Sequence, residues 1–421
     1  MWYGFTWFAM GYLRCTSVEC RAKKILRQNP LIGTDGHNDF LIKTRILYDG
    51  NITSDDFRSK FERGGMELQV DKPRLEESKI GGVFWSAFMP CPANGSDFSN
   101  ENYAPIVHDT YEQLELYHRL GAVYPRYFTP TPNATAANET WNRGTSEGSR
   151  RMDWFQFIAP VIIEGLHQIG NSVDNLRHYH RLGVRYATLT WNCHNIYADA
   201  ACVINEKGQT VKSSPHWGGL STQGRDIVLE MNRLGMMVDL SHVSVDTMRD
   251  ALIGDGDFKN WHGSVAPPIF SHSSAYALCP HPRNVPDDIL QLVKLRNSIV
   301  MVNFNPGFIS CVESNDGTGI PIVYQPNNTI HQVVRHIKYI GDLIGYEHVG
   351  LGSDFDGIED TPRGLEDVSK YPDLVKELLR QGVDDADVVK IVGRNILRVW
   401  QEVDDVAMRF IAAGEHATIG V

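Results

Sequence analysis

Three absences from this 421-residue sequence narrow the classes of protein to which it can belong. The seven cysteines include no C-x-x-C pair, which excludes the usual structural zinc sites built on that spacing. Basic residues are in deficit, with 40 Lys and Arg against 51 Asp and Glu and a net charge of −11, so the chain lacks the basic surface that nucleic-acid binding requires. There is also no internal repeat and no low-complexity tract. What remains is a soluble globular protein, in which 42% hydrophobic and 22% charged residues allow a sizeable core.

Long hydrophobic runs are also scarce. The first thirteen residues, Met1 to Leu13, are uncharged and mostly apolar, which suits a signal peptide or a short anchor. No basic residue precedes them, however, and the run is too short to span a bilayer, so both possibilities stay open. No later stretch has the length of a transmembrane helix.

Glycosylation sequons bear on the compartment. Two of the five N-x-S/T sequons lie in a Pro/Thr/Asn-rich segment from Thr129 to Arg150, which we expect to be an exposed loop. The sequon asparagines are Asn51, Asn94, Asn133, Asn138 and Asn327. Sequons favour secretion without deciding it. We therefore expect a glycoprotein of the secretory pathway or the extracellular space, with membrane association and a cytoplasmic location left open.

Eight short apolar runs recur along the chain, each followed by polar residues and a helical pattern. They are Leu31–Ile32, Gly82–Phe88, Phe157–Ile163, Val184–Thr190, Met236–Leu240, Pro268–Ser271, Ile299–Phe304 and Val349–Ser353. Continuous apolar runs are typical of strands buried on both faces. Alternation with helices predicts a parallel sheet, and eight units favour a closed (β/α)8 TIM-type barrel over an open doubly wound sheet. We assign residues 22–410 to this α/β barrel, 1–21 to an N-terminal segment and 411–421 to a tail.

Imidazoles and carboxylates stand at the carboxyl ends of these runs, where barrel enzymes build their sites. They occur in Asp35–Asp39, at Glu164 and His167, at His242, at His272 and in Asp354–Asp356. A single histidine after a strand is more often an ordinary hydrogen-bonded residue than a ligand. Several on one rim are different, because without a cation the carboxylates would repel one another. A bound metal pair resolves this, and such N and O ligands suit zinc, with manganese or cobalt as substitutes.

At these positions the chain resembles the membrane (renal) dipeptidase family, peptidase family M19, and in particular its fungal members. The resemblance runs from about Ala22 to Val403. It is carried by DGHND at 35–39, EGxH at 164–167, RYxTLT at 185–190, DLSHVS at 239–244, FSHSSAYALC at 270–279, RNVPDD at 283–288, MVNF at 301–304, GSDFDG at 352–357 and GLEDVSKYPDL at 364–374. It implies a metallo-dipeptidase that hydrolyses the peptide bond with a metal-bridging hydroxide. We also expect a homodimer.

The resemblance implies roles for individual residues. Two zinc ions per chain would be held by His37 and Asp39 on one side and by His242 and His272 on the other, with Glu164 bridging them as a catalytic ligand. Arg283 would bind the C-terminal carboxylate of a dipeptide, and Asp354 its free ammonium group, with a catalytic role. A guanidinium forks onto a carboxylate, and charges at both ends favour dipeptides over longer peptides. Taken alone, Arg283 suits a surface position before a helix and Asp354 a strand-end hydrogen-bond acceptor.

The resemblance also implies how the cysteines pair. Four of them fall where the family forms two intrachain disulfides, Cys91–Cys193 and Cys279–Cys311. Disulfides of this kind indicate an oxidising compartment. Cys15, Cys20 and Cys202 have no assigned role, and Cys202 suits a small buried hydrophobic position.

The sequence departs from the family at Trp191, where well-studied members carry a histidine that contacts the substrate. We assign Trp191 to substrate binding and catalysis, with three interpretations open. The indole N–H donates in place of the imidazole, His194 or a metal takes over the polarising role, or the chemistry has changed. Leu166, where the family often has glycine, narrows the space beside Glu164. The expected substrates are dipeptides, of Cys-Gly type or with a C-terminal D-residue; the alternatives are another small amide from specialised metabolism, or a catalytically silent homologue.

Overall fold

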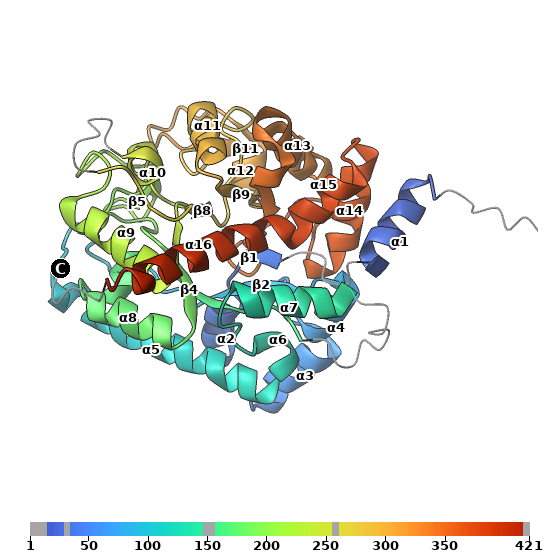
Figure 1. Ribbon diagram of the computed structural model, residues 1–421, viewed down its shortest axis with the longest axis horizontal. Helices are drawn as coiled ribbons and strands as arrows, with labels where there is room; N and C mark the ends of the chain where they lie inside the picture. The colour runs from blue at the N-terminus through green and yellow to red at the C-terminus, as the bar shows by residue number, and fades with distance from the viewer. Residues whose placement is uncertain (1–14, 29–33, 146–155, 255–260, 416–421) are drawn as a thin grey trace, which may run out of the picture.

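The computed structural model describes residues 15–28, 34–145, 156–254 and 261–415. Its central sheet has eight parallel strands in the order β1-β2-β3-β4-β7-β8-β9-β12. Their bounds are β1 Thr34–Asn38, β2 Gly82–Ser86, β3 Val161–Glu164, β4 Val184–Thr188, β7 Met237–Asp239, β8 Ile269–Phe270, β9 Ile299–Val302 and β12 Val349–Leu351. The strands lie at the centre of the molecule with helices around them (Figure 1).

The first and last strands meet, so the sheet closes. The backbone N–H of Asp39 donates to the Phe355 carbonyl at 2.9 Å, and that of Asp354 donates to the His37 carbonyl at 3.2 Å. A parallel bridge joins Asn38 to Phe355 just beyond β12. The fold is therefore the (β/α)8 barrel, and the open doubly wound sheet is excluded.

The first strand differs from its prediction. The apolar pair Leu31–Ile32 lies outside the described residues, and β1 is formed by the polar sequence TDGHN. Polar residues occupy a buried strand here because neighbouring segments satisfy them: Asp35 accepts the backbone N–H of Ser353, just after β12, at 2.8 Å and its hydroxyl at 2.6 Å. His37 accordingly lies within β1 and not after it.

Helices cover the outside of the barrel. The α-helices are α1 Val18–Gln28, α2 Phe40–Tyr48, α3 Asp55–Arg63, α4 Lys72–Ser78, α5 Asn100–Val123, α6 Pro125–Phe128, α7 Ala134–Thr145, α8 Val173–Arg181, α9 Thr222–Leu234, α10 Val245–Ile253, α11 Asp287–Leu295, α12 Pro306–Ile309, α13 Ile330–Ile344, α14 Tyr371–Arg380, α15 Asp385–Val389 and α16 Asn395–Ala412. Two short hairpins, β5 Cys202–Ile204 with β6 Thr210–Lys212 and β10 Cys311–Val312 with β11 Ile322–Val323, extend from the loops after β4 and β9.

Strand residues alternate between two cores. In β2, Trp85 faces outward and packs on the ring of Phe128 at 4.8 Å between centroids. Phe84 faces the barrel interior, where it packs on Tyr186 at 5.6 Å and on Trp400 of α16 at 5.7 Å. This alternation follows from the two-residue repeat of a strand. The interior core continues through Tyr186 to the functional site.

The part of the Thr129–Arg150 segment that the structure describes, residues 129–145, is not the exposed loop that its composition predicted, and residues 146–150 lie outside the described residues. Residues Ala134–Thr145 form α7, and Trp141 is fully buried. Ala134, Ala137 and Trp141 recur at helical spacing and pack in the interior core with α16. The polar composition of the segment did not indicate a buried helix face, because only three residues of the helix need to be apolar to form that face.

The outer segments extend the barrel. Helix α1 lies at the edge of the molecule beside α14 and α15 (Figure 1), and Arg21 pairs with Asp385 at 2.7 Å. The boundary expected at residue 21 falls inside α1, and the one at 410 falls inside α16. Met1 to Leu13 lie outside the described residues. Among the described helices, none is long and apolar enough to cross a membrane.

Candidate metal centre

The five side chains expected to bind metal converge at the carboxyl ends of four strands. His37 lies on β1 and Glu164 is the last residue of β3, so the barrel itself fixes both. The other three stand in the turns after β1, β7 and β8, and all five are buried; these three are Asp39, His242 and His272. At His242 the backbone φ is +66°, a left-handed conformation that costs energy for a residue with a side chain and often marks a functional position.

Glu164 stands between two groups of ligands. Its Oε1 lies 2.9 Å from His242 Nε2 and 3.4 Å from His272 Nε2. Its Oε2 lies 3.5 Å from His37 Nε2, which is itself 3.3 Å from Asp39 Oδ2. Each oxygen thus faces one group, as a bridging carboxylate must.

Hydrogen bonds fix which nitrogen of each histidine is free. His37 Nδ1 lies 2.8 Å from the Tyr186 hydroxyl, which donates its own proton to the Gly36 carbonyl, so Nδ1–H is the donor. His242 Nδ1 lies 3.1 Å from Asn192 Oδ1, an acceptor.

The same holds for the third histidine. His272 Nδ1 lies 2.8 Å from Ser271 Oγ, which donates to the Asp239 carboxylate at 2.6 Å. With Nδ1 protonated in all three rings, Nε2 is in each ring the nitrogen that faces Glu164. Outer partners of this kind orient metal-binding histidines.

The arrangement fits a pair of cations. His242 Nε2 and His272 Nε2 are 3.0 Å apart, so two lone pairs face each other unless a cation lies between them. Among the described residues, His37 Nε2 and Asp39 Oδ1 are buried without a hydrogen-bond partner. Buried polar atoms are normally paired, so these atoms are suited to hold a ligand.

The charge balance points the same way. Burial would raise the pKa of Glu164, but the surrounding histidines lower it well below its ordinary range, so the carboxylate stays ionised. Burial, aided by the charge of Arg283, lowers the pKa of His242 to about 3 and keeps that ring neutral. At His37 burial would lower the pKa, but the charges of Tyr186, Glu164 and Asp39 outweigh burial and raise the pKa well above its ordinary value, so a metal ion bound there would displace a proton from that ring. The ionised Glu164 and the neutral His242 are already in the forms that bind metal.

Arg283 and Asp354 lie beside this centre. The Arg283 guanidinium is buried, donates to the His272 carbonyl at 3.4 Å and stacks on Phe308 at 5.1 Å. No carboxylate of the described residues lies within ion-pair distance of it. A buried cation without an anion is costly, which makes Arg283 a candidate for binding an anionic group from outside. The surface position that its sequence context allowed is thereby excluded.

Asp354 faces His37 and His272, with ligand atoms of all three within 4.8 Å of one another. Asn303 Nδ2 donates a hydrogen bond to Asp354 Oδ2 at 3.0 Å, and the backbone φ of Asp354 is +65°. Burial, reinforced by the Asp39 and Glu164 carboxylates, raises the pKa of Asp354 to about 7. This carboxyl group can therefore gain or lose a proton near neutral pH.

Trp191 lies at the side of the metal centre. Its ring packs edge-on against Phe88 at 4.8 Å and lies 6.2 Å from the ring of His242. His194 instead pairs with Asp199 at 3.0 Å, and Leu166 is buried in the outer core. Of Trp191, His194 and Leu166, Trp191 is therefore the residue whose ring lies beside a ligand of the metal centre.

The cysteines form the two expected bonds, Cys91–Cys193 and Cys279–Cys311. A third bond, Cys15–Cys20, was not anticipated. Cys202 is a buried free thiol, as its small apolar role predicted.

Tyr186, Asn192, Ser271 and Asp239 were not identified from the sequence as partners of the histidines. Ser271 precedes His272 and Asn192 follows Trp191, so proximity was a signal for both. Tyr186 and Asp239 lie within the quoted motifs at 185–190 and 239–244, but their contacts cross between strands, so the motifs did not show which histidine each one supports.

Comparison with known proteins agrees with this geometry. Residues 19–413 match the model of the membrane dipeptidase family, peptidase family M19. Dipeptidase aclJ of Aspergillus oryzae is 43% identical over 385 residues, covering 91% of this chain and 81% of that protein. Dipeptidase tcpJ of Claviceps purpurea is 40% identical over 374 residues, covering 89% and 77%.

Solved structures share the fold. A dipeptidase AC of family M19 superposes with a TM-score of 0.69 at 23% identity, covering 89% of this chain and 99% of that one. A metallopeptidase of Rhodobacter sphaeroides, liganded with a phosphinate mimic of the dipeptide L-Ala-D-Ala, gives 0.68 at 24% identity, with the same coverage. The chain belongs to the membrane dipeptidase family, peptidase family M19, and is a metallo-dipeptidase.

Proposed function

We propose that this chain is a two-zinc enzyme that hydrolyses free dipeptides. The observation that carries the proposal is the convergence of three histidine Nε2 atoms on the two oxygens of Glu164. His37 and Asp39 would hold one ion, His242 and His272 the other, and Glu164 both. The N and O donors suit zinc. Two such ions would activate a water molecule and polarise the scissile carbonyl.

The protein's own charges would orient the substrate. Arg283, a buried guanidinium with no ion pair to a carboxylate among the described residues, would bind the substrate carboxylate in bidentate fashion. Asp354, a buried carboxyl group beside His37 and His272, would accept hydrogen bonds from the α-ammonium group. If Arg283 and Asp354 bind the two charged ends of one substrate, they would select for a molecule with one peptide bond.

Two substrate types are proposed within this class, dipeptides ending in a D-residue and Cys-Gly. The first is supported by the Rhodobacter sphaeroides structure, whose ligand mimics L-Ala-D-Ala. The aromatic pair Trp191 and Phe88 supports a second candidate function, in which the metal centre hydrolyses a bulkier specialised-metabolite amide. The indole would then pack on the substrate and not donate to it.

Blocked substrates test the proposal. Wild-type enzyme with zinc is assayed on Ala-D-Ala and Cys-Gly, on their C-terminal amides and on their N-acetyl forms. Each block removes one charge partner, which is worth about 1.5–3 kcal/mol, so kcat/KM should fall about 10- to 100-fold. In Arg283→Met the amide and the free acid should become nearly equal. Equal rates for blocked and free dipeptides in the wild type would contradict these roles.

Assembly and compartment stay proposals. We propose a homodimer, which light scattering of the purified chain checks. The three disulfides support an oxidising compartment, either the secretory pathway or the extracellular space. Intact-mass analysis of the protein from its native host tests whether the disulfides form and whether glycans are attached.

A further inference from the structure

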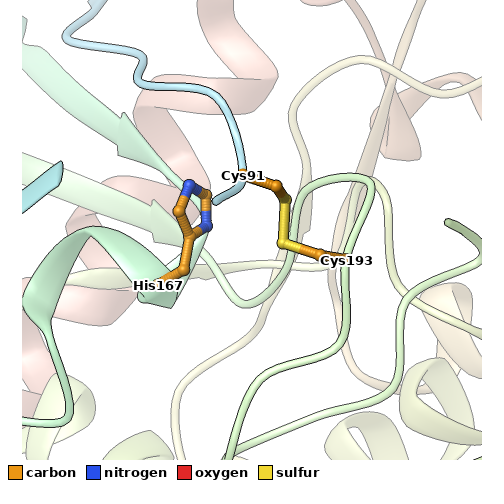
Figure 2. A group of neighbouring side chains, drawn as sticks. All are labelled: Cys91, His167 and Cys193. Carbon is orange, nitrogen blue, oxygen red and sulfur yellow. A yellow bond between two sulfur atoms is a disulfide. The ribbon is translucent and has the colours of Figure 1, made fainter. Parts of the chain in front are cut away.

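A second group of potential metal ligands lies outside the central site. It consists of Cys91, His167 and Cys193, here called the Cys2His cluster, and Figure 2 shows the imidazole beside the disulfide. Their ligand atoms all lie within 4.8 Å of one another. The residues come from three separate places, the loop after β2, the turn after β3 and the loop after β4.

The imidazole of His167 is already in the form that binds metal. Its Nε2 lies 2.9 Å from the Met89 carbonyl, an acceptor only, so Nε2 carries the proton. Nδ1 therefore holds a lone pair, and it is buried without a hydrogen-bond partner among the described residues. In Figure 2, Nδ1 is the ring nitrogen on the side of the sulfur atoms. An unpaired buried acceptor is costly, which points to a ligand.

The chain holds this ring close to the backbone. A Cβ at Gly165 would lie 2.5 Å from His167 Nδ1, so only glycine leaves room for the imidazole. Gly165 has a φ of +110°, which also favours glycine. Burial lowers the pKa of His167 to about 4, so the ring is neutral.

We propose that the Cys2His cluster binds a zinc ion when the Cys91–Cys193 disulfide is reduced. A dithiol donates two electrons and two protons, the S–S bond breaks, two thiols form, and the dithiol becomes a disulfide. Zinc then displaces the two thiol protons and binds both sulfurs and Nδ1. Two thiolates and one imidazole suit zinc and leave a fourth position for water.

A zinc ion bound by the reduced cluster would join the same two loops that the disulfide joins in the oxidised protein. The disulfide joins the loop of Cys91 to the loop of Cys193, and Cys193 follows Asn192, which orients His242. A metal bound to the reduced cluster keeps these loops joined. It shares no ligand with the central site, so the proposal does not depend on how many metals bind there.

Cobalt absorption tests the proposal on the full chain. Protein is reduced with a water-soluble phosphine, freed of reductant without air, and titrated with Co²⁺ beside an oxidised sample. Only thiolate ligands give a sulfur-to-cobalt charge-transfer band. We expect reduced protein to bind one more Co²⁺ per chain than oxidised protein, with this band. His167→Ala should weaken that binding by about 10-fold or more.

Matched variants assign the band. Cys15→Ser/Cys20→Ser, Cys279→Ser/Cys311→Ser and Cys202→Ser remove the other thiols and should keep the band, whereas Cys193→Ser should lose it. No band in folded, reduced wild type would overturn the proposal, as would a band that survives Cys193→Ser. Loss of the native circular dichroism on reduction would overturn it too, because the site requires the three loops in place.

Discussion

At the scale of single residues, Trp191 is the side chain that most distinguishes this centre. It borders His242 and packs on Phe88, and the family resemblance of the sequence implies a histidine at this position. If only the oxyanion contact differs, Trp191→His should raise kcat on dipeptides by up to about 10²–10³, the worth of one well-placed donor. The effect should fall on kcat more than on KM, because the contact strengthens as charge develops.

Trp191→Phe is the matched control, since it keeps the bulk and removes the N–H. Loss of activity in Trp191→Phe with recovery in Trp191→His identifies the indole N–H as the donor. A lower rate in Trp191→His with an unchanged rate in Trp191→Phe would contradict this and favour the aromatic-wall hypothesis.

Asp239 helps to orient a metal-binding histidine through Ser271. Its carboxylate accepts the Ser271 hydroxyl at 2.6 Å, and Ser271 holds His272 Nδ1. Asp239→Asn puts a donor where an acceptor is needed, so metal affinity should fall by about 10- to 100-fold. Ser271→Ala should lower the metal affinity in the same way. Ser54→Ala, which removes the N-cap of helix α3 far from the site's hydrogen bonds, should leave the metal affinity unchanged. Competition with a chelator dye measures the affinity, and an unchanged value in Asp239→Asn would refute the support role.

At the scale of secondary-structure elements, the loop after β4 is organised around Asp199. Its carboxylate accepts backbone N–H groups of His216, Trp217 and Gly218 at 2.8–3.1 Å and pairs with His194. Burial opposes its charge, but these donors lower its pKa from 3.8 to about 2.

This depressed pKa predicts a pH dependence of stability. The folded pKa lies below the unfolded one, so the stabilisation is complete above the unfolded value and is lost as the pH falls towards 2. Asp199→Asn should lower the unfolding free energy at pH 7 by about 1 kcal/mol after allowance for solvent screening, and by less in acid. Urea unfolding at several pH values measures this, with the exposed Asp174→Asn as control. A deficit that grows in acid would contradict the assignment.

The strands also show how far sequence reasoning reaches. Seven of the eight runs overlap strands, because residues buried on both faces must be continuously apolar. β1 does not follow that rule because residues of other segments pair with its polar side chains, as Ser353, just after β12, pairs with Asp35. The site residues were placed together because parallel strands end at one rim. Their orienting partners, such as Tyr186, come from distant strands, and only the closed barrel brings them into contact.

At the scale of the whole molecule, one barrel brings ligands from four strands to a single point. Residues separated by more than 200 positions, such as His37 and His272, have rings stacked at 4.0 Å between centroids. The site therefore exists only in the folded barrel. Metal binding and folding should be coupled, because the unfolded chain offers no such cluster.

Metal content measured together with activity tests the central claim most directly. The account predicts two zinc ions per chain by elemental analysis, loss of dipeptide hydrolysis on removal by a chelator, and recovery on return of zinc. His242→Ala and His272→Ala should hold about one ion, and Glu164→Ala should bind both weakly, since it is the shared ligand. Hydrolysis that persists without metal, or an unchanged zinc content in all three variants, would contradict the account.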